Sequence, residues 1–104
     1  MSFNYTKTIN GNLIGEFINN KQEQVFTEFS EIEEHNNNIE NFEGYYQSCW
    51  KESDTPILLN LEVSLCSTLK YSFIWRDFKQ ETIFKGEGFL ITNKQISGFY
   101  YTPK

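Results

Sequence analysis

The segment Glu81–Tyr101, ETIFKGEGFLITNKQISGFYY, decides the fold. Apolar β-branched and aromatic residues recur in both of its halves, and residues 92–94 (TNK) between them have the composition of a tight turn. Gly86 and Gly88 lie two residues apart and therefore face the same side of the first strand. Glycine weakens a strand unless its space is needed, so the pair predicts a strongly bent strand or a bulky aromatic side chain crossing it. The segment predicts the closing hairpin of a small, curved antiparallel sheet.

Further short strands are predicted along the rest of the chain. Residues 57–65 (ILLNLEVSL) place an apolar side chain at every odd position, and residues 69–78 (LKYSFIWRDF) alternate in a similar way. Asn10-Gly11 is a strong hairpin signal, because both residues tolerate a positive φ. About eight short strands predict one all-β domain over residues 1–104, a small antiparallel up-and-down barrel or a strongly bent sandwich. Strands this short favour an interior filled by side chains.

Residues 30–42 (SEIEEHNNNIENF) follow a different pattern. Their few apolar residues are three apart, which is helical spacing, and Ser30 with Glu33 matches a capping box. The asparagine run at residues 36–38 would end such a helix. The segment therefore predicts a short helical turn and an exposed loop inserted between strands.

The composition bounds the class of protein. Aromatic residues make up 17% of the 104 residues, which is enough for a core that needs no disulfide or metal. Cys49 and Cys66 each lie in an apolar run and are expected to be small buried thiols; a disulfide would require their strands to be neighbours. The N-terminal residues lack an apolar signal segment, and no apolar run approaches the ~20 residues that span a bilayer. We therefore expect a cytoplasmic protein that does not enter a membrane.

The net charge of −5 is concentrated in one segment. Residues 16–43 contain eight acids and one base, a balance of −7, whereas the remainder carries +2. Such an acidic domain is not expected to bind nucleic acid directly, because phosphate binding depends on Lys and Arg. The segment predicts a docking surface for a basic protein, with a plain solvated face as the alternative. The expected contact residues are the acids Glu28, Glu31, Glu33, Glu34, Glu40 and Glu43, with Tyr45 and Tyr46 as aromatic anchors.

No arrangement of residues in the sequence points to catalysis. His35 is the only histidine, and it lies in a polar segment without a nucleophile nearby. Glu33-Glu34-His35 lacks the second histidine of a zinc helix, and Gly86-x-Gly88 lacks the third glycine and the helix of a phosphate loop. We therefore expect a protein that is not an enzyme and holds no cofactor or metal.

The order of motifs from Gly44 onward resembles the calycin group of lipocalin-like small barrels. The motifs are GYYQSCW (44–50), ILLNLEVSL (57–65), YSFIW (71–75), FKGEGFL (84–90) and ISGFYY (96–101). The resemblance implies a β-meander with a glycine-rich late hairpin and a pocket for a small apolar ligand. The interior aromatic residues Phe73, Trp75, Phe84 and Tyr100 would line this pocket, or would simply form the core.

By type, a small, acidic, asparagine-rich chain without a catalytic motif resembles bacterial immunity proteins, including those of contact-dependent inhibition systems. That resemblance implies a non-enzymatic inhibitor that masks the basic active site of a cognate toxin, most plausibly a nuclease. We take this inhibitor as the first hypothesis and the apolar-ligand binder as the alternative. A homodimeric or edge-strand interaction module is a third.

Overall fold

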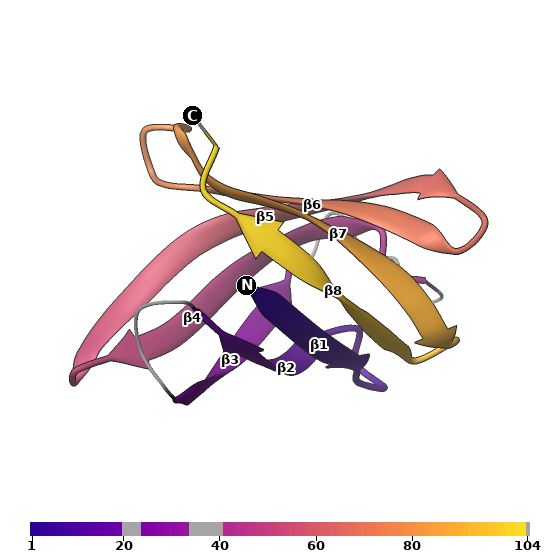
Figure 1. Ribbon diagram of the computed structural model, residues 1–104, viewed down its shortest axis with the longest axis horizontal. Helices are drawn as coiled ribbons and strands as arrows, with labels where there is room; N and C mark the ends of the chain where they lie inside the picture. Colours follow the sequence, from indigo (N-terminus) through magenta and orange to yellow (C-terminus); the bar gives the residue numbers. More distant parts are fainter. Residues whose placement is uncertain (20–23, 34–40, 104) are drawn as a thin grey trace.

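The computed structural model describes residues 1–19, 24–33 and 41–103, which form an eight-stranded antiparallel barrel (Figure 1). The strands are β1 (Ser2–Lys7), β2 (Leu13–Ile18), β3 (Val25–Ile32), β4 (Gly44–Glu52), β5 (Thr55–Ser67), β6 (Lys70–Arg76), β7 (Thr82–Thr92) and β8 (Gln95–Tyr101). Each strand pairs with the next, and β1 pairs with β8 to close the barrel. The predicted up-and-down barrel is confirmed. Within the described residues there is no helix long and apolar enough to cross a membrane.

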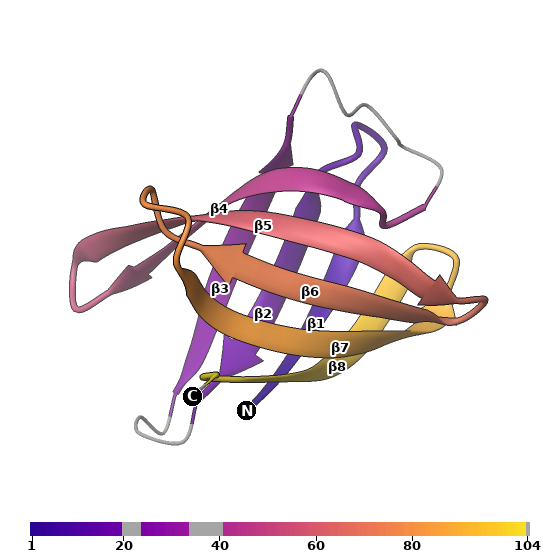
Figure 2. The same cartoon turned by 90° about the horizontal axis from the view of Figure 1, so that it is seen from above.

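The barrel is flattened into two curved layers. β5, β6 and β7 arch over β1, β2 and β3 at a steep crossing angle, and the β4–β5 hairpin projects beyond the body of the barrel (Figure 2). All eight strands are hydrogen-bonded on both sides, so closure removes the free edges that an open sheet would expose. The edge-strand version of the third hypothesis therefore has no unpaired strand among the described residues on which to act.

The alternation read from the sequence gives the inward face of the central strands correctly. On β5 the buried residues are Leu59, Leu61 and Val63, and on β6 they are Tyr71, Phe73 and Trp75. Leu65 and Leu69 were expected on the same faces but are exposed. Both lie near the β5–β6 turn, where the register shifts between Leu65 and Ser67 and the strands leave the core.

The closing hairpin has the predicted form. β7 and β8 pair from Lys85–Tyr101 to Thr92–Gln95, so the turn falls at Asn93-Lys94. Gly88 points into the barrel, and a Cβ there would lie 2.8 Å from Cε1 of Phe73. The second glycine of the pair thus provides the space that an aromatic side chain of the neighbouring strand occupies, as predicted.

The beginning of the predicted insertion is a strand instead. Ser30 is not a helix cap, because β3 continues to Ile32 and Ser30 points into the interior. Residues 34–40 lie outside the described part of the chain. The expectation of two buried thiols is also wrong. Cys49 is half-buried on the outer face of β4, opposite Leu58, and Cys66 is exposed far along β5; both thiols are free.

One end of the barrel is filled by side chains around Phe42. This residue is completely buried, and its ring meets Tyr71 edge-on at 5.8 Å. The Tyr46 hydroxyl donates a hydrogen bond of 2.8 Å to the Phe42 carbonyl and accepts one of 2.8 Å from Lys7 Nζ. Phe42 therefore closes the barrel end at which β4 begins.

Candidate ligand-binding cavity

The opposite end of the barrel contains a cavity of about 370 Å³. Its rim lies where β1 begins and where β2, β4 and β8 end, at Met1, Asn19, Glu52 and Thr102. Its walls are aromatic: Phe3, Tyr5, Phe17, Trp50, Trp75, Phe84 and Tyr100. Since the other end is filled, the interior is neither wholly packed, as the short strands suggested, nor a continuous channel. The interior contains a pocket that opens at one end of the barrel.

The aromatic walls are held by one another and by hydrogen bonds. Phe17 meets Trp50 and Tyr100 edge-on at 5.4 and 5.9 Å, and Phe84 meets Tyr100 at 5.4 Å. The Tyr100 hydroxyl donates to the Ile18 carbonyl at 3.0 Å. Edge-to-face packing of this kind fixes ring orientations, so the shape of the pocket is preformed.

A glutamate lies among these aromatic residues. On β3 the side chains of Phe26, Glu28 and Ser30 alternate inward, and Glu28 is 2% exposed. The Tyr5 hydroxyl donates to Glu28 Oε1 at 2.6 Å, and Trp75 Nε1 donates to Oε2 at 3.3 Å. Ser30 Oγ also donates to Oε2, at 3.1 Å. The carboxyl is therefore held by donors from three strands.

A glycine allows Tyr5 to reach this carboxyl. Gly15 on β2 lies opposite both Tyr5 on β1 and Glu28 on β3. It points inward, and a Cβ there would lie 2.8 Å from Cε1 of the Tyr5 ring. Because Gly15 has no side chain, the tyrosine can lean across β2 and place its hydroxyl on the carboxyl.

Burial changes the protonation behaviour of this group. Removal from water raises the pKa of Glu28, although hydrogen bonds from Tyr5, Ser48, Trp75 and Ser30 act in the opposite direction. Burial, with the neighbouring Glu28, also raises the pKa of Tyr5 well above its ordinary value. Burial is the main reason that the pKa of Tyr100 is raised to about 12. The two phenols facing the cavity thus keep their protons at neutral pH and act as hydrogen-bond donors.

The structure brings together three of the four aromatic residues expected in a pocket. Trp75, Phe84 and Tyr100 line the cavity. Phe73 does not: it is fully buried and stacks on Trp75 at 5.7 Å, deeper in the core. The sequence interpretation missed Glu28 as a lining residue, although the alternation of β3 places it on the face of Phe26. It also missed Trp50, whose Nε1 donates to Glu52 at 3.3 Å on the rim.

Two of the residues expected on an acidic docking surface are buried instead. Glu28 faces the cavity, and Tyr46 is 0% exposed and hydrogen-bonded to Phe42. The prediction for both residues is wrong because it followed their closeness in sequence to other acids. The alternation of β3 and β4 places both side chains on the inward face. Glu34 and Glu40, also expected on that surface, lie outside the described residues.

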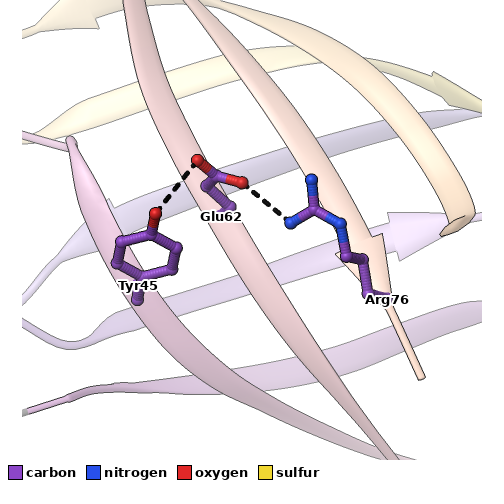
Figure 3. A network of polar contacts seen from close by, with 3 residues as sticks. All are labelled: Tyr45, Glu62 and Arg76. Carbon is purple, nitrogen blue, oxygen red and sulfur yellow. Dashed lines mark hydrogen bonds and ion pairs between the residues drawn. The ribbon is translucent and has the colours of Figure 1, made fainter. Parts of the chain in front are cut away.

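The remaining expected contact residues lie close together on the outside. Glu31 and Glu43 are exposed and Glu33 is half-buried, and the Glu33 amide donates to the Tyr45 carbonyl at 2.9 Å. Tyr45 is 44% exposed, and its hydroxyl donates to Glu62 Oε2 at 3.3 Å, while Arg76 donates to Oε1 at 2.8 Å (Figure 3). The described part of this surface is therefore acidic around one exposed aromatic ring.

Comparisons with known proteins assign no function to this cavity. The sequence matches no protein-family model, no curated protein and no solved structure. Within the described residues, no three His, Cys, Asp or Glu side chains are grouped so as to hold a metal ion. The arrangement that remains is an aromatic pocket with a buried carboxyl, which can enclose a small molecule and orient it through hydrogen bonds.

Proposed function

We propose that the protein binds a small molecule with a large apolar surface inside its barrel. The observation that carries the proposal is the 370 Å³ cavity, which is walled by seven aromatic residues. Its volume falls within the range of about 300–1000 Å³ that is typical of small-molecule sites. Preformed aromatic walls also lose little conformational freedom when a ligand binds, so more of the contact energy appears as affinity.

We propose that the cavity binds its ligand without catalysing a reaction. Tyr5 and Tyr100 are the hydroxyl-bearing aromatic residues of the wall, and burial raises the pKa of both, so they stay protonated at neutral pH as ordinary phenols do. A protonated phenol is a poor nucleophile. Each hydroxyl already donates its hydrogen within the protein, Tyr5 to Glu28 and Tyr100 to the Ile18 carbonyl, so toward a ligand these oxygens can only accept.

Tryptophan fluorescence tests the proposal directly, because Trp50 and Trp75 both line the cavity. Titration with the uncharged apolar dye N-phenyl-1-naphthylamine should quench tryptophan emission saturably, with one dye bound per chain. Phe84→Ala, in the wall, should change the dissociation constant. Phe99→Ala is the matched control on the outer face of β8 and should leave it unchanged. Absence of saturable binding, or equal effects of the two variants, would contradict the proposal.

A second candidate function is inhibition of a basic protein, such as a nuclease toxin, by the outer acidic surface. It is favoured by one observation: Glu31, Glu33 and Glu43 lie around the exposed Tyr45. Exposed carboxylates attract a cationic cleft at long range and raise the association rate. A central aromatic ring could be the anchor of such an interface.

The inhibitor hypothesis is tested by native mass spectrometry of the protein purified from its host, followed by kinetics with any basic protein found in the complex. Replacing Glu31 and Glu43 by Gln should slow association, and rising salt should do the same for the unmodified chain. Glu81→Gln, at another exposed position, is the control. Association that is insensitive to both salt and the paired substitution would contradict the hypothesis.

A further inference from the structure

The charge inside the cavity indicates what kind of ligand fits it. Two carboxyl groups face the cavity: Glu28 within the barrel and Glu52 at the rim. No lysine or arginine side chain is among the lining residues that the structure describes. Lys7 is the buried lysine of the barrel, and its Nζ is bound to Tyr46 at the filled end. The charged side chains that line the described pocket are therefore acids alone.

Among the described residues, the groups that donate hydrogen bonds to Glu28 are all neutral. Tyr5, Trp75 and Ser30 donate hydrogen bonds to its oxygens, and Ser48 extends the network through a contact of 2.7 Å to Ser30 Oγ. These donors solvate the carboxylate, but none of them brings a positive charge. A buried carboxylate without a counter-ion is unfavourable, and a cation entering the cavity would relieve that cost.

The walls favour the same kind of ligand. The faces of aromatic rings carry negative electrostatic potential and attract cations, most strongly for tryptophan and where water is excluded. Both tryptophans of the wall, Trp50 and Trp75, line the cavity. Trp75 directs its Nε1–H edge toward Glu28, so an aromatic face that attracts the cation must come from the other rings of the wall.

From these observations we propose that the ligand is an organic cation, an amine with an apolar or aromatic body, whose ammonium group meets Glu28. The inference rests on the proposed function, since it assumes that the cavity is a ligand site. Glu28 is the residue that determines specificity, and the aromatic walls hold the apolar body. Burial, the main cause of the raised pKa of Glu28, makes a cation beside its carboxylate favourable.

The test compares three ligands that share one ring system and differ in charge: 1-naphthylmethylamine, 1-naphthalenemethanol and 1-naphthoate. Each competes with N-phenyl-1-naphthylamine for the wild-type protein at neutral pH. The amine should displace the dye at concentrations at least tenfold lower than the alcohol, and the carboxylate should be the weakest. In Glu28→Gln the amine should lose its advantage while the alcohol still competes. Glu16→Gln, exposed on the outer face of β2, should behave as the wild type.

Each result has a distinct meaning. If the dye binds but the alcohol competes as well as the amine, the cation inference is wrong and the apolar pocket stands. If the dye does not bind at all, the proposed function itself is wrong. If Glu28→Gln fails to fold, as shown by its near-ultraviolet circular dichroism, the three-ligand comparison on the wild type still decides, and Glu52→Gln tests the rim carboxyl separately.

Discussion

Glu28 is unusual because it is an acidic residue that is almost completely buried. Its carboxyl lies in an aromatic interior, and donors on three strands compensate for the loss of water. A buried acid held in this way destabilises the folded state whenever it is ionised, unless hydrogen bonds fully replace its hydration. Its position in the wall of the cavity is the reason we propose that it contacts the ligand.

The raised pKa of Glu28 predicts the sign of a pH effect on stability. Folded Glu28 keeps its proton above about pH 4.5, where the carboxyl of the unfolded chain ionises, so its contribution is fully present below that pH. The contribution is lost as the pH rises through the folded pKa. The unfolding free energy of the wild type should therefore fall relative to that of Glu28→Gln as the pH rises above about 4.5. Denaturant titrations at several pH values measure the unfolding free energies of both proteins. A wild type that becomes more stable relative to Glu28→Gln as the pH rises would contradict the prediction.

Gly15 offers a second test at a single position. In Gly15→Ala the new methyl group would overlap both the Tyr5 ring and the backbone carbonyl oxygen of Asn4, neither of which can move away freely. We expect a loss of about 1–3 kcal/mol in unfolding free energy, typical of overpacking. Glu16→Ala, the adjacent residue on the outer face of β2, should change it by less than about 0.5 kcal/mol. Equal losses for the two variants in urea denaturation would show that the absence of a side chain at Gly15 is not needed for the packing of Tyr5 against β2.

The strands and their connections divide the barrel into a filled end and a lined pocket. Phe42 precedes β4, and its burial depends on hydrogen bonds that join it to Tyr46 and, through that residue, to Lys7 on β1. Burial lowers the pKa of Lys7 to about 8, with Lys94 nearby adding to the effect. Phe42 is therefore part of the core and closes the barrel opposite the mouth.

Removing the Phe42 ring should have a large effect on stability. Phe42→Ala leaves a cavity at the filled end and should lower the unfolding free energy by about 3–5 kcal/mol. Phe78→Ala is the matched control, because Phe78 is 70% exposed, and it should cost less than about 0.5 kcal/mol. Thermal and urea denaturation followed by circular dichroism measure both, and a small effect at Phe42 would mean that it does not close the barrel.

For the molecule as a whole, closure depends on one seam between the two ends of the chain. β8 pairs with β1 from Ser2–Phe99 to Thr6–Gln95, and these strands are separated by nearly the whole sequence. Closing such a long loop is costly in chain entropy, and the seam repays it by burying Tyr5, Ile96 and Tyr100. Without it, β1 and β8 would become free edges.

Proline in the seam tests this dependence. Ser97 pairs with Asn4 on β1 and Phe89 on β7, so Ser97→Pro removes an amide hydrogen and places a rigid ring between two paired strands. We expect a sharply lower melting temperature and concentration-dependent association in size-exclusion chromatography. Ser97→Ala, at the same outward-facing position, should remain monodisperse and close to the wild type. A cooperative, wild-type-like melt for the proline variant would contradict a barrel closed at this seam.

The candidate site was only partly visible in the sequence. Trp75, Phe84 and Tyr100 could be predicted as interior, since alternation assigns each side chain to a face. Which interior side chains line a cavity and which pack solidly depends on the distance between opposite walls, and Phe73 fell on the packed side. Trp50 lines the cavity because closure of the barrel brings β4 within contact of Phe17 on β2, whose ring it meets edge-on at 5.4 Å.

By itself the sequence determined the strands, the closing hairpin with its turn near residues 92–94, the glycine at position 88 that makes room for an aromatic ring, and the all-β class. These depend on local alternation and turn chemistry, which short segments carry. Only the tertiary structure decided that Glu28 is an interior residue and that one end of the barrel is hollow. Burying a carboxyl requires donors to replace its water, and those donors come from β1, β3 and β6, which meet only when the barrel closes.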